Sequence, residues 1–124
     1  MNVEQLDRAL RSTDEVEITV TGRESGEPVT RTVWFVGEDD RLYLLPVRGS
    51  DSEWFKHVRK KPAICIAAGR AEVTALARPI LDAAKVREVV EKFRAKYRAD
   101  QVRKYYSKLD VAVEVPVGTE AHHG

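Results

Sequence analysis

The sequence predicts a mainly β fold with additional helices (α+β), in which six antiparallel strands form a small barrel and helices cap its ends. Six segments carry the alternating or uniformly apolar patterns of β-strands, and the first three follow one another through short connections. A helical pattern of apolar residues separates the third strand from the fourth and returns before the last strand. An open α+β sheet with its helices on one face is the alternative arrangement of the same elements.

The N-terminal part of the chain predicts one helix followed by three strands. Residues 2–11 place their apolar residues at helical spacing, which indicates a short amphipathic helix. Residues 16–21 alternate apolar and polar residues, as a half-buried strand does. Residues 29–36 and 41–47 are rich in β-branched and aromatic residues, and the turn 37–40 separates them. Three strands with such short connections form an antiparallel meander.

The apolar period changes in the middle of the chain. Residues 50–61 place three bulky apolar side chains on one side of a helix, which ends at Pro62. Ser50, Asp51 or Ser52 is expected to cap this helix, and Ser50 and Glu53 have the spacing of a capping box. Residues 63–68 are apolar on both faces and therefore predict a central strand.

The last part of the chain predicts a strand, two helices and a closing strand. Residues 71–80 form the fifth predicted strand, which is long. Asp82 is expected to cap a long helix with an apolar face, and Asp100 is expected to cap a shorter one. Residues 109–117 alternate apolar and polar residues and predict the sixth strand, which completes the sheet.

Length and composition are those of a globular protein with one domain, expected over residues 1–117 and followed by a disordered tail at 118–124. The chain has 124 residues and a net charge of +1, so its bulk charge does not favour a nucleic-acid partner. The longest apolar run, residues 63–68, is too short for a membrane span, and no signal peptide is visible. The single Cys65 is expected to be a buried, inert thiol, and together these features predict a cytoplasmic location.

Arg31 is the first candidate for a ligand contact. In the strand 29–36 it shares a face with Val29, Val33 and Phe35. A charged side chain on an apolar face either pairs with a carboxylate or serves a ligand. The opposite register, in which the threonines of the strand face inward, is the alternative. Arg31 is therefore a candidate contact for a cofactor.

Arg48, Gly49 and Ser50 form the second candidate, an anion-binding turn. They follow the third strand and open the helix at 50–61, where free amides and the positive end of the helix dipole suit a phosphate or carboxylate. Gly49 permits the backbone to approach an anion closely, and Arg48 adds a guanidinium group with paired N–H donors. A structural role, in which Ser50 caps the helix and Gly49 makes the turn, explains the same residues.

The loop TGRESGEP, residues 21–28, connects the first two strands and is longer than a two-residue hairpin requires. Its two glycines and its serine suit a longer turn, whereas Arg23 and the free amides suit an anion. Arg23, Arg31 and Arg48 all lie at or near strand ends. They would surround one pocket if the sheet curls into a barrel.

Aromatic residues and one histidine complete the candidates. Trp54 is expected either to anchor the core or to stack on a cofactor, and His57 lies on the same side of its helix. Tyr105 and Tyr106 either pack in the core with their hydroxyls at its rim or line the mouth of a substrate site. No Cys, His and carboxylate residues have the spacing of metal ligands, so no metal site is predicted.

Several of these segments together resemble the deazaflavin-dependent nitroreductase family. That family belongs to the FMN-binding split β-barrel superfamily, which includes relatives of pyridoxamine phosphate oxidase. The resemblance covers residues 16–68 well and the remainder more loosely. It is carried by the loop Gly22-Arg23-x-Ser25-Gly26 running into the strand Val33-Trp34-Phe35, by the turn Arg48-Gly49-Ser50, and by a helix with Trp54 eight residues before Pro62.

The resemblance implies a six-stranded split β-barrel that forms a homodimer and holds a flavin-like ring between its subunits. Arg23 would meet the phosphate or acidic tail of the cofactor, and Val33 and Trp34 would lie against the ring. The turn at 48–50 would hold phosphate. By the same comparison Trp54 would buttress the ring, His57 stands where the family commonly has Asn, and Tyr105 and Tyr106 would border the substrate.

Two departures from the family pattern leave a deazaflavin coenzyme, FMN, another flat ligand and no cofactor as open alternatives. Glu24 stands where the family has lysine after Gly-Arg, and its charge would repel a polyglutamylated deazaflavin tail. Thr32 stands where the family has proline before the apolar strand pair.

The function implied is that of a flavin- or deazaflavin-dependent oxidoreductase that transfers hydride to a small organic acceptor, as a nitroreductase does. The ring of the cofactor carries such chemistry, so the enzyme needs no acid–base triad, and none is visible in the sequence. A non-catalytic protein that binds a flavin, a haem or a small anion in the same barrel is the main alternative. A barrel that only dimerises is the third.

Overall fold

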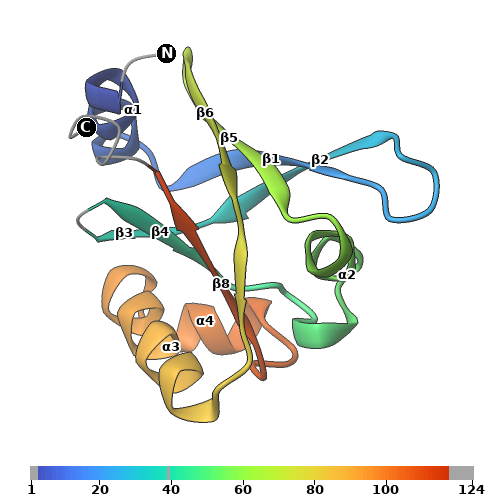
Figure 1. Cartoon of the computed structure of the whole chain (residues 1–124). Coiled ribbons are helices and arrows are strands. Elements are labelled where there is room, and N and C mark those ends of the chain that lie inside the picture. The colour runs from blue at the N-terminus through green and yellow to red at the C-terminus, as the bar shows by residue number, and fades with distance from the viewer. Residues whose placement is uncertain (1–2, 39, 118–124) are drawn as a thin grey trace.

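The computed structural model describes residues 3–38 and 40–117, which form two four-stranded antiparallel sheets with helices packed around them (Figure 1). The tail at 118–124, for which the sequence predicts disorder, lies outside the described residues. In chain order the elements are α1 (Val3–Arg11), β1 (Glu15–Thr21), β2 (Pro28–Trp34), β3 (Val36–Glu38), β4 (Arg41–Leu44), the 3-10 helix η1 (Gly49–Asp51), α2 (Glu53–Lys60), β5 (Ala63–Ala68), β6 (Ala71–Leu76), β7 (Arg78–Ile80), α3 (Ala83–Tyr97), α4 (Ala99–Tyr105) and β8 (Ala112–Pro116).

Two chain segments pass from one sheet to the other, and this explains why the structure has eight described strands where the sequence predicts six. The first sheet has the strand order β2-β1-β5-β6 and the second has the order β3-β4-β8-β7. The predicted strand 29–36 is divided at Phe35 into β2 and β3, and the predicted strand 71–80 is divided at Ala77 into β6 and β7. The α+β class is confirmed, and the strands form two sheets consistent with a split barrel.

The crossing at Phe35 is held by the last turn of α3. The Phe35 N–H donates to the Tyr97 hydroxyl at 3.1 Å, and Lys96 Nζ donates to the Phe35 carbonyl at 2.8 Å. The Tyr97 hydroxyl also lies within hydrogen-bond distance of two carbonyl oxygens, those of Phe35 (2.8 Å) and Asp14 (2.7 Å). Buried backbone groups need hydrogen-bond partners. At the crossing Tyr97 provides the hydrogen bonds that a neighbouring strand provides elsewhere in the sheet.

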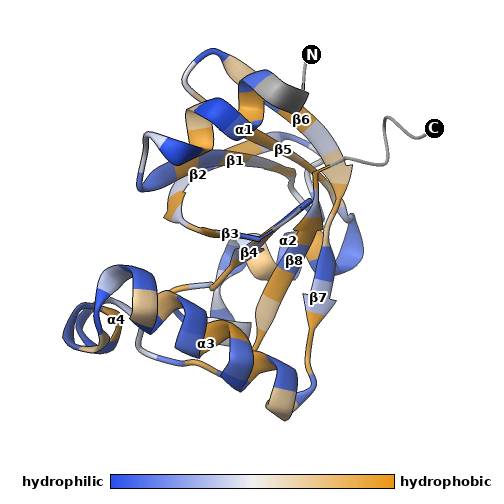
Figure 2. Ribbon diagram, turned by 90° about the vertical axis from the view of Figure 1, so that its left-hand side faces the viewer, coloured by the Kyte–Doolittle hydropathy of each residue, from blue (hydrophilic) through white to orange (hydrophobic). Residues whose placement is uncertain are grey.

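Apolar side chains form two clusters, one on each side of the second sheet. The first cluster fills the space between the two sheets and includes Ile18, Phe35 and Ile66. The second lies between the second sheet and the helices α3 and α4, and it includes Tyr43 and Phe93. Figure 2 shows that α3 carries both hydrophobic and hydrophilic residues, as a helix with one buried face does. β5 is central in its sheet, as predicted.

The start of α2 differs from the prediction. Gly49–Asp51 forms a separate 3-10 turn, and Ser52, one of the three residues expected to cap the helix, is the N-cap of α2. The predicted capping box is wrong because the Ser50 hydroxyl donates to Asp110 instead of capping the helix. The third strand ends at Leu44 rather than at residue 47, and the Gly49 N–H then donates to the carbonyl of Pro46.

The two C-terminal helices begin differently. Asp82 caps α3 as predicted, because its carboxylate accepts from the Lys85 N–H at 2.9 Å. The prediction that Asp100 caps the next helix is wrong, since Arg98 is the N-cap of α4 and Asp100 lies in its first turn. Arg98 has a φ of 79°, which is a strained value for a residue with a side chain.

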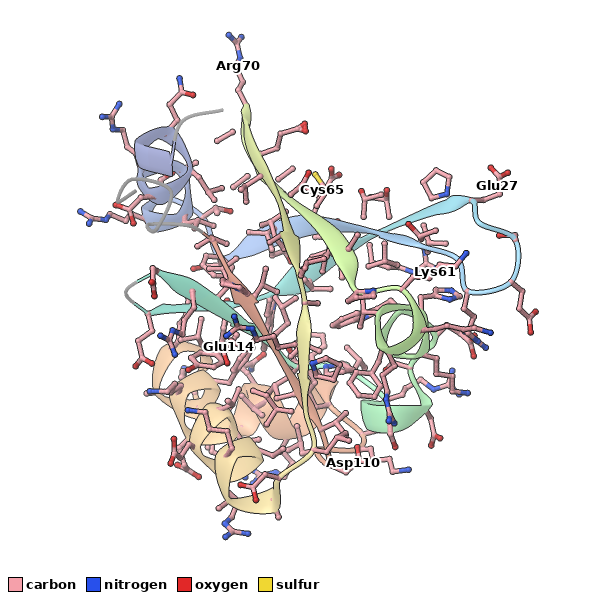
Figure 3. The ribbon with its side chains drawn as sticks, in the orientation of Figure 1. Glu27, Lys61, Cys65, Arg70, Asp110 and Glu114 are labelled. Carbon is pink, nitrogen blue, oxygen red and sulfur yellow. The ribbon has the colours of Figure 1, made fainter. Side chains whose placement is uncertain are left out.

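Cys65 is half-buried and lies on the outer face of β5, so the prediction of a buried thiol is wrong (Figure 3). Ile64 and Ile66 fill the inner face of the strand, and the alternation along β5 leaves Cys65 on the other side. Burial, followed by the nearby Glu72 carboxylate, raises the pKa of the Cys65 thiol.

The Tyr97 hydroxyl is expected to contribute to stability in a pH-dependent way. In Tyr97→Phe we expect the free energy of unfolding near neutral pH to fall by about 1–3 kcal/mol, because Phe35 loses a buried partner. Burial raises the pKa of Tyr97 to about 12 in the folded protein, whereas an unperturbed tyrosine has a pKa of about 10. The difference in free energy of unfolding between the wild type and Tyr97→Phe should therefore decline as the pH rises from about 10 to about 12. Denaturant unfolding of both proteins across this pH range measures the difference.

Tyr105→Phe is the matched control, because Tyr105 is exposed and its hydroxyl makes no hydrogen bond within the described residues. Its free energy of unfolding should stay close to that of the wild type. An equal loss in both variants would contradict the role assigned to Tyr97.

Candidate functional site

Arg31 lies on the face of the edge strand β2 that is directed toward the first apolar cluster. The register pairs Arg31 with the buried Ile18 and Val33 with the buried Val16, so the apolar-face register is the one adopted. Arg31 is nevertheless exposed, because β2 is the edge of the first sheet. Its guanidinium donates to the carbonyl of Thr30 at 2.9 Å and has no carboxylate partner among the described residues. This part of β2 is an apolar face with one unpaired cation.

Arg23 is held by α2 rather than presented to a ligand. Its guanidinium lies 3.0 Å from the Glu53 carboxylate, and its backbone N–H donates to His57 Nδ1 at 3.0 Å. Arg23 Nη1 also lies 3.1 Å from the same ring nitrogen. The structure therefore brings together two predicted site residues, Arg23 and His57, in a cluster closed by Glu53. The hydrogen bond from Arg23, followed by the electrostatic attraction of its charge, lowers the pKa of Glu53.

The glycines and serine of the loop 21–28 close a turn. The Gly22 N–H donates to the Glu27 carbonyl at 2.8 Å, and the Gly26 N–H donates to the Gly22 carbonyl at 3.0 Å. The Ser25 hydroxyl accepts from the Glu27 N–H at 3.1 Å. Several N–H groups of the loop that could have bound an anion therefore form hydrogen bonds within the loop.

The turn at Gly49 and Ser50 holds an internal carboxylate. Asp110 accepts from the Ser50 N–H at 2.9 Å and from the Ser50 hydroxyl at 2.6 Å, and Figure 3 shows Asp110 beside η1. Gly49 has a φ of 56°, and a Cβ at this position would lie 2.1 Å from Asp110 Oδ1. Lys108 Nζ lies 3.1 Å from Asp51 and 3.8 Å from Asp110. The predicted anion-binding geometry is present, and Asp110 occupies it.

Arg48 and Trp54 have different surroundings. The Arg48 N–H donates to the Ser52 hydroxyl at 2.8 Å, while its exposed guanidinium has no carboxylate partner among the described residues. Trp54 is buried in the cluster between the sheets. Trp54 is therefore the core anchor of α2, and its ring is enclosed by protein.

Trp34 lies in an aromatic group with Tyr97, Tyr105 and Tyr106. Its ring stacks on Tyr97 with the centroids 4.2 Å apart. The Tyr105 and Tyr106 rings approach it edge-on at 4.9 Å and 6.0 Å. One face of the indole is thus occupied by an aromatic ring of the same chain.

A cavity of about 310 Å³ lies beside this aromatic group, between α3, α4 and the segment before β8. Tyr106, one of the two predicted substrate residues, lines it, whereas Tyr105 is exposed. The residues that line the cavity are Arg94, Ala99, Val102, Arg103, Tyr106 and Leu109.

The three arginines named from the sequence have different surroundings: Arg23 pairs with Glu53, whereas Arg31 and Arg48 have no carboxylate partner in the part of the chain that the structure describes. Asp110 was not singled out from the sequence, and Glu53 was assigned to a capping box. Both contacts depend on side chains brought together by the fold, and for Asp110 the partners are 60 residues apart, so no local pattern signals it.

Two classes of site are not found in the described residues. Within 3–38 and 40–117, no group of three or more His, Cys, Asp and Glu side chains is placed to hold a metal ion. Of the helices that the structure describes, none has both the length and the apolar character needed to cross a membrane.

Gly49→Ala and Gly26→Ala form a matched pair that tests the closed turn. Both glycines have positive φ, 56° and 77°, so each alanine adds the strain of a left-handed residue, about 1–2 kcal/mol. Nothing lies within 4 Å of a Cβ at Gly26, whereas at Gly49 it meets Asp110 and the Lys108 carbonyl. We expect Gly49→Ala to cost about 1–3 kcal/mol more than Gly26→Ala in denaturant unfolding. Equal costs would show that Asp110 does not occupy the turn.

Asp110→Asn tests the same contact through acid stability. Partial burial opposes ionisation of Asp110, but the hydrogen bonds from Ser50 hold the pKa of its carboxyl below the ordinary value. A lowered pKa adds stability above the unfolded-state pKa of about 3.9, and this stability is lost as the pH falls through the folded-state pKa. The wild type should therefore exceed Asp110→Asn in free energy of unfolding at neutral pH, and the difference should decline as the pH falls below about 4.

Asp7→Asn is the control for this acid series, since Asp7 is an exposed residue of α1 that pairs with Arg11 on the same helix. Exposed pairs of this kind contribute little to stability. A constant difference between wild type and Asp110→Asn at all pH values would contradict the assignment.

Solved structures share this fold. An F420-H2 dependent reductase is 19% identical, with a TM-score of 0.65 over 82% of this chain and 93% of that chain. HutZ, the haem storage protein from Vibrio cholerae, is 10% identical, with a TM-score of 0.72 over 96% and 92%. A Clostridium acetobutylicum protein of the pyridoxinephosphate oxidase family, related to general stress protein 26, is 13% identical, with a TM-score of 0.64 over 93% and 82%.

At these identities the similarity concerns the fold, and it agrees with the split-barrel arrangement expected from the sequence resemblance. Among curated proteins, none matches the sequence. The family match is to a family other than the nitroreductases that the sequence resembles. Residues 5–115 match the family described as uncharacterized proteins conserved in bacteria (DUF2255), and the chain belongs to that family.

Proposed function

We propose that the protein binds a flavin-type cofactor, FMN or a deazaflavin coenzyme, and transfers hydride to a small organic acceptor. The observation that carries the proposal is the face of β2 that holds the half-buried Val33 and the exposed Arg31, whose guanidinium has no carboxylate partner among the described residues. A flat ring with an anionic group is complementary to such a face. The fold shared with an F420-H2 dependent reductase and a protein of the pyridoxinephosphate oxidase family supports the same class of function.

The predicted cofactor residues differ in how well their surroundings suit the anionic group of a flavin-type cofactor. Arg31 and Arg48 have exposed guanidinium groups without carboxylate partners among the described residues, so they suit a phosphate. The turn at Gly49 and Ser50 fits it poorly, because the Asp110 carboxylate already accepts from the Ser50 N–H and hydroxyl. We therefore assign the phosphate to the two arginines.

The other predicted cofactor residues have partners within the chain. Trp34 stacks on Tyr97, and Trp54 is enclosed in the core, which leaves Val33 as the side chain proposed to lie against the ring. Arg23 and His57 are engaged with each other and with Glu53. We propose that these two hold the loop 21–28 beside α2 and do not bind the cofactor directly.

In the proposed enzyme the cofactor supplies the hydride chemistry, and the chain supplies binding and electrostatics. Arg31 places a permanent positive charge on the face that would carry the ring. Such a charge stabilises the negative charge of a reduced flavin-type ring. The same guanidinium orients the ring by fixing its anionic end, while Val33 excludes water from one side.

We also propose a cytoplasmic homodimer in which a second copy completes the site. The face of β2 that carries Arg31 is exposed at that residue within one chain. A second subunit over that face would enclose a ring that one chain leaves open to water. This proposal follows the family resemblance at residues 16–68.

Binding without turnover is the second candidate function. It is favoured by the fold shared with a haem storage protein. The visible spectrum of the purified protein separates the two candidates, because flavin, deazaflavin and haem absorb differently. Reoxidation of the bound, reduced ring by an added nitroaromatic or quinone acceptor would support the enzyme.

The double variant Arg31→Ala, Arg48→Ala is expected to lose affinity for FMN or the deazaflavin coenzyme by about tenfold or more, with an unchanged melting temperature of the free protein. The reason is the loss of two charge-assisted hydrogen-bonding groups. Titration followed by absorbance or fluorescence measures the affinity. The thermal shift on adding cofactor should shrink in parallel.

Arg59→Ala, Arg87→Ala is the matched control, since these arginines are also exposed and have no carboxylate partner among the described residues. Its affinity should equal that of the wild type. Equal losses in both double variants would indicate a general charge effect. Failure of FMN, deazaflavin and hemin to raise the melting temperature of the wild type would overturn the proposal.

A further inference from the structure

We propose that the cavity between α3, α4 and the segment before β8 is a binding site for a small carboxylic acid with an apolar body. The cavity has a volume of about 310 Å³, which is at the lower end of the range for small-molecule sites. The inference concerns this cavity alone and does not depend on the proposed cofactor.

The apolar part of the cavity comes from two elements. Ala99 and Val102 belong to α4, and Leu109 lies in the segment that leads to β8. Val102 is almost fully buried and Leu109 is half-buried, so this part of the lining is packed against the second apolar cluster. A hydrocarbon or aromatic group placed here would replace water on an apolar surface.

Tyr106 provides a buried polar group that has no partner. The residue lines the cavity and is only 7% exposed, yet its hydroxyl makes no hydrogen bond within the described residues. Burial raises the pKa of Tyr106, so the hydroxyl keeps its proton and can donate. Because buried hydroxyl groups are normally hydrogen-bonded, the missing acceptor is a feature that a ligand oxygen would supply.

Two arginines give the cavity its charge. Arg94 is already bound to Glu91 on the same helix, whereas Arg103 is exposed and has no carboxylate partner among residues 3–38 and 40–117. A guanidinium recognises a carboxylate through paired N–H donors. Arg103 is therefore the residue proposed to bind the carboxylate, and the Tyr106 hydroxyl is proposed as the second donor.

This combination selects one class of ligand. Inorganic phosphate would bind the arginine side chains but would leave the apolar lining exposed to water. A neutral amide would fill the apolar part but would offer no negative charge to Arg103. A small carboxylic acid uses both halves of the cavity. Tyr106 also packs against Trp34 in a T-shaped arrangement, with the ring centroids 6.0 Å apart.

The experiment is an NMR titration of isotope-labelled protein with benzoate, benzamide and inorganic phosphate, at fixed ionic strength and without any flavin. Benzamide has the shape of benzoate without its charge. We expect benzoate to shift the methyl signals of Val102 and Leu109 at lower concentration than benzamide does. Phosphate should leave these methyl signals unchanged. Because no cofactor is present, the result is independent of the proposed oxidoreductase function.

Three variants sharpen the titration. Arg103→Gln should weaken benzoate binding by about tenfold or more, and Tyr106→Phe by about threefold to tenfold, from the usual strengths of charged and neutral hydrogen bonds. Arg87→Gln, an exposed arginine of α3 outside the cavity lining, should bind benzoate like the wild type. Tyr106→Phe removes a hydroxyl without a protein partner, so its melting temperature should not fall.

Several outcomes would overturn the inference. Benzamide and benzoate binding with equal affinity would remove the role of Arg103, as would an Arg103→Gln variant with unchanged affinity. Shifts confined to residues outside the cavity would place the ligand elsewhere. A lower melting temperature for Tyr106→Phe would show that the hydroxyl already has a partner in the protein.

Discussion

The structure depends on how the chain passes from one sheet to the other at Phe35. A strand that leaves its sheet exposes backbone groups that no neighbouring strand satisfies, and burying such groups is costly. Here the Tyr97 hydroxyl and Lys96 Nζ bind the Phe35 backbone, and Tyr97 also reaches the carbonyl of Asp14. One turn of α3 therefore fixes the angle between the sheets, and with it the position of β2 and the aromatic group around Trp34.

The positions that the sequence offers to an external anion are largely taken by internal carboxylates. Asp110 accepts from Ser50, and Glu53 pairs with Arg23. Each carboxylate satisfies donors that would otherwise need water or a ligand, so these contacts hold the loops against neighbouring elements. Arg31, on the open face of β2, and Arg103, at the cavity of α3 and α4, have no such partner among the described residues. These two unpaired cations mark the surfaces where a ligand is proposed.

Local patterns predicted the elements well where one principle dominates. Alternation identified β1 and the buried face of Val16, Ile18 and Val20, and Asp82 caps α3 as its position indicates. The predictions were wrong where two principles compete. Ser50 suits a helix cap, but its hydroxyl is bound by Asp110. Cys65 lies in an apolar run, yet the period of two places it on the outer face of β5.

The sequence by itself determined the α+β class and the order of helices and strands, because both follow from periodicity within a few residues. The pairing of β2 with β1 decided which face of β2 carries Arg31. Only the tertiary structure decided that Arg23 faces Glu53, that Asp110 fills the turn at Ser50 and that Tyr106 lines a cavity without a hydrogen-bond partner. These contacts join side chains from different elements. Their distances depend on how the sheets cross and how the helices pack, which no local pattern encodes.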